Sequence, residues 1–145
     1  GEVPILVQSM ATGLGEALLG FRRDPQVGPV ILLAAGGTLA EVWRDRAVRM
    51  APVTLEDAGG MIAEVRAFRA LEGHRGAPRG DMAALAAAVV AMSRLAERPE
   101  VLEAEVNPLL VRAEGQGVLA LDAVVRVAAM VELRGIEPLA SSLRT

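Results

Sequence analysis

Residues 103–109 read Glu-Ala-Glu-Val-Asn-Pro-Leu, and after a glycine-containing turn the chain returns to Leu121-Asp122. Glu105 and Asn107 are two positions apart, so on a β-strand their side chains point to the same face. The returning strand can bring Asp122 beside Asn107, which gathers three oxygen-bearing side chains at one end of a hairpin. Such hard oxygen ligands suit Mg²⁺, which takes one or two carboxylates together with phosphate oxygens and water. This stretch therefore predicts a β-hairpin that carries a candidate metal site.

A simpler interpretation of the same residues stays open. Spacing alone favours Asn107-Pro108 as the start of a turn and Glu105 as a solvated charge. The apolar neighbours favour the site instead, because they predict a buried hairpin, on which an acid needs a partner. These neighbours are Val106, Leu109, Leu110, Val118 and Leu121.

Upstream of this hairpin the pattern indicates strands followed by helices. Turn residues fill 24–29, and the Gly36-Gly37 pair interrupts the apolar pattern. Between these breaks, apolar or alternating runs predict a buried strand at 4–7 and further strands at 16–22, 30–35 and 38–50, the last being one strand or two.

Two helices are expected next. Thr54 and Asp57 approximate a capping box and open a helix that runs through Phe68. Asp81 caps a second, alanine-rich helix that reaches about Ala96. The remaining strands are expected at 101–106, 109–112 and 118–121.

The order of strands, two helices and strands predicts an α+β fold. In it, a mostly antiparallel sheet carries both helices packed on one face. The pattern decays from Arg126, so we assign residues 1–126 to this domain and 127–145 to a C-terminal tail.

Composition narrows the classes of function. Of 145 residues, 52% are apolar but only 2% are aromatic, and the net charge is −3, which argues against nucleic-acid binding. The absence of cysteine excludes disulfides, cysteine zinc sites and thiol catalysis. No signal-peptide pattern is present, and the apolar runs fall short of a membrane span of about 20 residues. We expect a soluble, cytoplasmic domain, and Gly1 before a strand pattern suggests a cut inside a longer protein.

Two further segments are candidates for ligand contact. Gln8, Ser9 and Met10 end the first predicted strand, and Glu16 lies beyond a glycine turn. Backbone groups at such an edge can bind an adenine, and Met10 can cover its face, although a strand followed by a polar turn is the commoner explanation. The Gly36-Gly37 pair can let backbone approach a phosphate, or it simply bends the chain between two strands.

The only histidine, His74, lies in a basic, glycine-rich loop with Arg75 and Arg79. Arginines in such a loop can hold an anion. A solvated basic loop is the simpler expectation, so we assign no catalytic role to His74.

Taken together, these segments resemble the ATP-grasp domain of ADP-forming acetyl-CoA and acyl-CoA synthetases, which are related to the succinyl-CoA synthetase beta subunit. The chain looks like the C-terminal subdomain of that domain, from about residue 4 to 125. The most specific motifs are Arg-Asp-Pro at 23–25 with Gly28-Pro29, and the stretch at 103–109 with Asp122. The other matching pieces are collinear and lie at 6–10, 15–16, 36–37 with Glu41, 49–52 and 71–76.

The resemblance implies roles for individual residues. The residues matching Asn107 and Asp122 hold Mg²⁺ on the phosphates of ATP or ADP, and the acid matching Glu105 lies at the same metal and phosphoryl site. The strand matching residues 5–10 borders the adenine, and the segment matching Gly36-Gly37 lies on the sheet that covers the nucleotide. The reaction is acyl-CoA + ADP + phosphate ⇌ acid + CoA + ATP, through an acyl phosphate and a phosphohistidine.

The resemblance also implies partners. The first ATP-grasp subdomain and a CoA-binding domain are missing from this chain, which is therefore expected to be inactive alone. The family often has Arg at the position of Val124, so a regulatory, non-catalytic synthetase-like domain of a protein acetyltransferase is the alternative. A third interpretation is an assembly module without a nucleotide site, with an exposed apolar patch that supports a homodimer.

Overall fold

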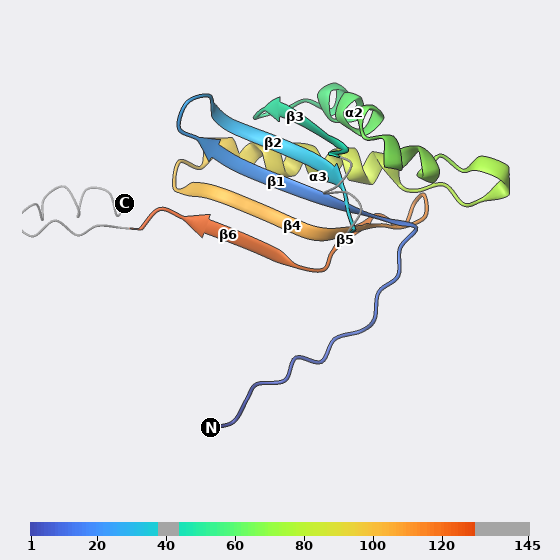
Figure 1. Ribbon diagram of the computed structural model, residues 1–145, viewed down its shortest axis with the longest axis horizontal. Coiled ribbons are helices and arrows are strands. Elements are labelled where there is room, and N and C mark those ends of the chain that lie inside the picture. The colour runs from blue at the N-terminus through green and yellow to red at the C-terminus, as the bar shows by residue number, and fades with distance from the viewer. Residues whose placement is uncertain (38–43, 130–145) are drawn as a thin grey trace, which may run out of the picture.

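The computed structural model describes residues 1–37 and 44–129. Within these residues six strands form one sheet in the order β3-β2-β1-β4-β5, with β6 also paired to β4 (Figure 1). All of their pairings are antiparallel, which confirms the predicted type of sheet. The strands are β1 (Gly15–Asp24), β2 (Gly28–Ala35), β3 (Arg46–Met50), β4 (Val101–Val111), β5 (Val118–Ala120) and β6 (Ala123–Val127).

The first hairpin forms where the turn residues predict it. The Asp24 carboxylate accepts hydrogen bonds from the backbone N–H groups of Gln26 (2.8 Å) and Val27 (3.1 Å), which closes the turn between β1 and β2. β3 confirms the C-terminal part of the strand expected at 38–50. Residues 38–43 lie outside the described residues, and so does Glu41.

Helix α2 (Leu55–Glu64) begins at the predicted capping box. The Thr54 hydroxyl accepts from the backbone N–H of Asp57 (3.1 Å), and the Asp57 carboxylate accepts from the backbone N–H of Thr54 (2.9 Å). Each side chain therefore satisfies a backbone donor that the first turn of a helix leaves free.

The predicted end of this helix at Phe68 is wrong, since α2 stops at Glu64 and a 3₁₀ helix, η1 (Arg66–Leu71), follows. The Asp45 carboxylate, just before β3, accepts from the backbone N–H groups of Arg66 (2.7 Å) and Ala67 (2.8 Å). These bonds start a new helical segment, and a partner so distant in sequence leaves no local signal.

The second predicted helix is α3 (Met82–Ser93), and Asp81 caps it by accepting from the backbone N–H of Ala84 (3.0 Å). Its expected last turn is the 3₁₀ helix η3 (Arg94–Glu97). A short 3₁₀ turn, η2 (His74–Gly76), lies in the basic loop before α3.

Both helices pack on one face of the sheet, as Figure 1 shows and as predicted. Strand alternation sends every second side chain of β1 and β2 into this core, where fully buried apolar side chains meet the helices. The strand residues involved are Ala17, Leu19, Phe21, Ile31, Leu33 and Ala35, and the helical ones include Met61, Leu85 and Val89.

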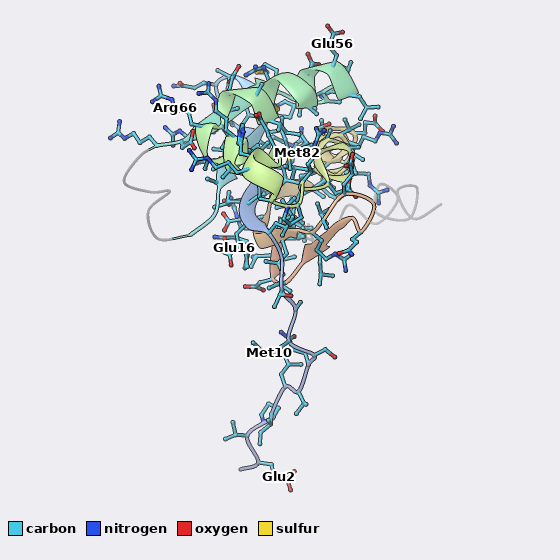
Figure 2. The ribbon with its side chains drawn as sticks, turned by 90° about the vertical axis from the view of Figure 1, so that its right-hand side faces the viewer. Glu2, Met10, Glu16, Glu56, Arg66 and Met82 are labelled. Atoms are coloured by element: carbon cyan, nitrogen blue, oxygen red, sulfur yellow. The ribbon has the colours of Figure 1, made fainter. Side chains whose placement is uncertain are left out.

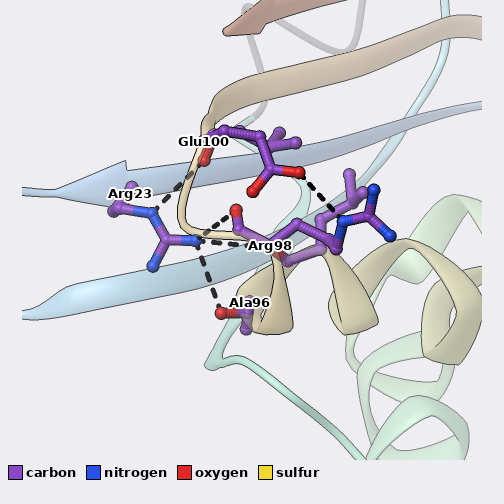
Figure 3. A network of polar contacts seen from close by, with 6 residues as sticks. Arg23, Ala96, Arg98 and Glu100 are labelled. Atoms are coloured by element: carbon purple, nitrogen blue, oxygen red, sulfur yellow. Dashed lines mark hydrogen bonds and ion pairs between the residues drawn. The ribbon is translucent and has the colours of Figure 1, made fainter. Parts of the chain in front are cut away.

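Arg23 holds the connection between α3 and β4 (Figure 3). Its guanidinium group donates to the carbonyl of Val101 (3.2 Å) at the start of β4. It also donates to the carbonyls of Leu95, Ala96 and Arg98, at 3.1–3.4 Å, at the C-terminal end of η3. A cation at this end gives the last carbonyls of the helix a charged donor, in addition to the backbone N–H groups that bond to Leu95 and Arg98.

The predicted buried strand at 4–7 is wrong. The segment before β1 has no secondary structure, and Ile5, Leu6 and Val7 are more than 80% exposed. An apolar run forms a buried strand only when a neighbouring strand and a covering layer accept it, and nothing among the described residues does so here.

The hairpin after α3 also differs from expectation. Asn107-Pro108 does not separate two strands, because β4 runs through it with a bulge relative to β1 and a cis peptide bond. β6 was not expected: the last predicted strand ends at 121 and the pattern was expected to decay from Arg126, whereas β6 spans Ala123–Val127 and pairs with the free edge of β4. The boundary between a domain at 1–126 and a tail stays a prediction.

No helix in the described ranges is long and apolar enough to cross a membrane.

Candidate functional site

The face of the sheet opposite α2 and α3 carries no helix within the described part of the chain (Figure 1). We call it the open face. The strand registers arrange its side chains in rows, because residues paired across antiparallel strands share a face. One such row, from β3 to β6, consists of Val48, Leu32, Gly20, Glu105 and Val124.

Asn107 and Asp122 lie opposite each other on the open face. β4 pairs with β5 and β6 in one unbroken register, from Leu109↔Ala120 on one side of the kink to Val106↔Ala123 on the other. The backbone N–H of Asn107 donates to the carbonyl of Asp122 at 3.0 Å. The pairs on either side put Asn107 and Asp122 opposite each other, a position in which Cβ atoms of an antiparallel pair are about 4.5–5.5 Å apart.

Glu105 lies on the same face, two residues before Asn107 on β4 and paired with Gly20 of β1. All three polar side chains of this group, Glu105, Asn107 and Asp122, are exposed. The structure thus brings together the residues that the sequence singled out, and their role as metal ligands stays a prediction.

A shallow pocket of about 400 Å³ lies on the open face beside this group. Its floor is largely aliphatic, and Gly20 leaves bare backbone in the middle of it. Glu105 and Asn107 line one side, while Arg22, Arg46 and the Gly36-Gly37 pair line others. The floor residues are Leu18, Val30, Leu32 and Ala34.

Close packing against Glu16 explains why position 36 is a glycine. Its N–H donates to the carbonyl of Glu16 at 2.8 Å, and a Cβ at position 36 would lie 2.7 Å from the Glu16 Cβ. Two backbones can approach this closely only when one residue has no side chain. The predicted bend after β2 is confirmed, and Gly37 follows it with a φ of 96°. A contact of this pair with phosphate stays a prediction.

Gln8, Ser9 and Met10 are not part of this arrangement. They lie in the extended segment that leaves the domain before β1, and Met10 is 95% exposed (Figure 2). Glu16 follows at the start of β1, next to the pocket through Gly36. The proposed adenine contact of residues 8–10 is untested, because the structure puts nothing against them.

The oxygen atoms of this group suit Mg²⁺, but they supply only part of its coordination shell. Within residues 1–37 and 44–129 no three His, Cys, Asp or Glu side chains gather closely enough to hold a metal by themselves. Glu105, Asn107 and Asp122 offer two carboxylates and an amide oxygen. This matches a cation that commonly takes one or two carboxylates and completes its coordination with phosphate oxygens and water.

Gly20, Arg22 and Arg46 line the pocket but were not predicted from the sequence. The alternation along β1 could have placed the first two, because Leu18, Gly20 and Arg22 alternate with buried neighbours. Only the pairing of β3 with β2 reveals that Arg46 shares the face with Ala34. His74 is exposed and lies 3.6 Å from the Glu72 carboxylate, as expected of a solvated loop.

Comparison with known proteins identifies this architecture. Residues 3–127 match the family described as the ATP-grasp domain, and the chain belongs to that family. Its relatives include ADP-forming acyl-CoA synthetases.

Two of these relatives are acetate–CoA ligases from archaea. The chain is 41% identical over 116 residues to the ADP-forming acetate–CoA ligase I of Archaeoglobus fulgidus, covering 79% of the chain and 17% of that protein. It is 39% identical over 109 residues to the beta subunit of the corresponding Pyrococcus furiosus enzyme, covering 74% of the chain and 46% of that subunit. The chain thus spans less than half the length of either relative.

Solved structures agree with the sequence relatives. The acetyl-coenzyme A synthetase 1 of Ca. Korarchaeum cryptofilum, in complex with coenzyme A and Mg-AMPPCP, has a TM-score of 0.74 and 32% identity, covering 82% of this chain and 55% of that one. A Pyrococcus horikoshii Ot3 protein has a TM-score of 0.77 and 28% identity, covering 83% and 52%. The predicted fold class is thereby confirmed.

Proposed function

We propose that the chain is the nucleotide- and Mg²⁺-binding part of an NDP-forming acyl-CoA synthetase, which catalyses acyl-CoA + ADP + phosphate ⇌ acid + CoA + ATP. The single observation that carries this proposal is the register that gathers Glu105, Asn107 and Asp122 beside a pocket on the open face. The Korarchaeum relative, solved with Mg-AMPPCP, supports the choice of ligand.

In this proposal Asn107 and Asp122 hold the metal ion, and Glu105 is the catalytic acid at the phosphoryl end of the same site. When bound, Mg²⁺ would neutralise charge on the nucleotide phosphates. The chain's own residues position that group: the carboxylates and amide orient it from one side, and backbone at Gly36-Gly37 approaches it from another. Arg22 and Arg46 add positive charge on the same face.

Because the proposed site is incomplete, we expect other domains to supply the rest of it. The first ATP-grasp subdomain would supply the opposite wall, and the adenine contacts of Gln8, Ser9, Met10 and Glu16 would be completed there. A CoA-binding domain would bring the acyl group, so the chain alone is expected to be inactive. We place the protein in the cytoplasm, with no nucleic-acid partner.

Removing the metal ligands tests the proposal. We expect Asn107→Ala combined with Asp122→Ala to abolish Mg²⁺-dependent ADP binding by the full-length protein that contains this chain, because both side chains that hold the metal are lost. Isothermal titration with ADP at saturating Mg²⁺ measures the effect.

A matched control removes an acid and an amide from the same hairpin. Glu114 and Gln116 are exposed in the turn between β4 and β5, and Glu114→Ala combined with Gln116→Ala should leave binding unchanged. Equal ADP affinity in the wild type and the Asn107/Asp122 double variant would contradict the proposed site.

A regulatory function is the second candidate, and Val124 favours it. This residue lies directly opposite Glu105 on the open face, where the family often has Arg. A synthetase-like domain without that positive charge could sense a ligand in a protein acetyltransferase without turnover. An acetyltransferase domain in the same gene product, together with nucleotide binding but no acyl-CoA synthesis, would favour this function.

A further inference from the structure

Asp81 is a buried carboxylate with two separate tasks. It is only 8% exposed. Its Oδ1 accepts from the backbone N–H of Ala84 (3.0 Å) and caps α3. Its Oδ2 accepts from the backbone N–H groups of Gly115 (3.0 Å) and Gly117 (2.8 Å) in the turn between β4 and β5. One side chain thus joins the helix layer to the hairpin that carries the candidate site.

Backbone hydrogen bonds also anchor the turn to the residues before α3: the Glu114 N–H donates to the Arg79 carbonyl (2.9 Å), and the Asp81 N–H donates to the Arg112 carbonyl (2.8 Å). Within the turn, Gln116 N–H donates to the Ala113 carbonyl (2.8 Å), and Arg112 N–H donates to the Gly117 carbonyl (3.2 Å). Gly115 and Gly117 both have positive φ, at 85° and 81°, so the turn depends on residues with wide conformational freedom. The two bonds to Asp81 fix this part of the backbone from outside the hairpin.

Asp122 depends on this turn through β5. The strand has only three residues, Val118–Ala120, and ends two positions before Asp122. Three residue pairs with β4 set the register of β5, and β6 continues the same register beyond Asp122. A slip of one residue turns every side chain of a strand to the other face. Such a slip would remove the Asp122 carboxylate from the open face and from Asn107.

We propose that Asp81 is a positioning residue for the metal–phosphate site: by holding the turn at 113–117 it fixes the register of β5 and keeps Asp122 beside Asn107. This inference rests on the proposed function, in which Asp122 is a metal ligand. Asp81 acts through Asp122 and does not itself touch the metal or the nucleotide.

The chain offers variants that separate the two tasks. Asp81→Asn retains one acceptor oxygen, which can still cap α3, but its amide group cannot accept from the Gly115 and Gly117 N–H groups. Asp81→Ser can also cap the helix, with a hydroxyl too short to reach the turn. Thr54→Ala is the matched control, because it removes the N-cap of α2 without any contact to the hairpin.

Two measurements on the full-length protein that contains this chain test the inference. The first is the Mg²⁺ concentration that gives half-maximal ADP binding. The second is the hydrogen-exchange rate of the amides at 118–122, which needs no ligand. We expect Asp81→Asn and Asp81→Ser to raise the half-maximal Mg²⁺ concentration by about tenfold, as losses of outer-shell partners do, and to speed the exchange. Thr54→Ala should change neither.

An unchanged Mg²⁺ dependence, or unchanged exchange at 118–122, in both Asp81 variants would overturn the inference. Failure of the proposed function looks different, because the wild-type protein would then not bind ADP at any Mg²⁺ concentration. In that case the exchange rates still decide whether Asp81 fixes the register.

Discussion

Gly20 occupies the middle of β1, where a larger residue would pack better in a strand. Its backbone does not require glycine, because a Cβ there would meet nothing closer than 3.9 Å, from the Leu18 side chain. Gly36, by contrast, has no room for a Cβ beside Glu16. The bare backbone at Gly20 therefore keeps the floor of the pocket open, as at sites where a ligand lies close to a strand.

A larger side chain at position 20 should weaken nucleotide binding without lowering the stability of the fold. We expect Gly20→Val to leave the free energy of unfolding unchanged or to raise it by about 0.5–1 kcal/mol, because valine suits a strand interior. The same change should weaken ADP binding by about tenfold or more, equivalent to ~1.4 kcal/mol. Urea unfolding and ADP titration of the full-length protein measure the two effects.

Gly59→Ala serves as the control for this substitution. Position 59 lies on α2 with nothing within 4 Å of an added Cβ, far from the open face in the fold. It should stabilise the helix by about 1 kcal/mol without affecting binding. Tight ADP binding by Gly20→Val would show that no ligand approaches the sheet at this point.

At the scale of elements, features set by short local motifs could be predicted from the sequence, and features set by distant pairings could not. The first hairpin and both helix starts follow from short motifs, such as Asp24 in its turn and Thr54 with Asp57. The end of α2 depends on Asp45, which leaves no signal in the helix itself. The valines of β6 are a local strand signal, but its pairing depends on the free edge of β4. Strand registers are nonlocal: the alternation along β1 indicates the face on which Gly20 lies, but only the pairing of β1 with β4 puts Gly20 beside Glu105.

The hydrogen bonds of Arg23 join β1 to the connection between α3 and β4. We expect Arg23→Ala to lower the free energy of unfolding by about 1–2 kcal/mol, because four backbone carbonyls lose a charged donor but part of the site can take up water. Urea unfolding measures the loss, with Arg126→Ala as the control. Among the described residues the Arg126 side chain pairs with Glu103 at the surface, and its loss should cost far less. An equal loss of unfolding free energy in Arg23→Ala and Arg126→Ala would contradict a stabilising role of the Arg23 hydrogen bonds.

On the scale of the whole molecule, the helices of residues 1–37 and 44–129 form one layer that covers one side of the sheet. The open face combines an aliphatic floor with charged side chains, and Val124 of β6, which lies on it, is 66% exposed. Such a surface suits one wall of a site whose other wall is a separate subdomain. A homodimer through this face remains the competing prediction, and the oligomeric state of the full-length protein decides between them.

Acid should destabilise the fold as a whole. Backbone N–H groups, those of Ala84 and Gly117 foremost, lower the pKa of Asp81, and the Thr54 N–H lowers the pKa of Asp57 in the same way. Because the folded-state pKa lies below the unfolded one, the stabilisation is present above the ordinary carboxylate pKa and is lost as pH falls through the folded value. We expect unfolding by urea to require less denaturant at pH 3 than at pH 7.

Asp81→Asn isolates one contribution to this effect. The variant cannot lose a proton from position 81, so its stability should fall less between pH 7 and pH 3 than that of the wild type. An equal fall in both proteins would show that Asp81 is ionised to the same degree in the folded and unfolded states.

The unbroken pairing of β4 with β5 and β6 also limits how related sequences can differ. Turns at the surface usually gain and lose residues freely during evolution. Here one residue more or less on one side of the pairing would exchange the two faces of the returning strand, and Asp122 would turn toward the helices. A family member that keeps this arrangement should therefore keep the two paired stretches that match residues 107–111 and 118–122 equal in length, even where their residues have changed completely.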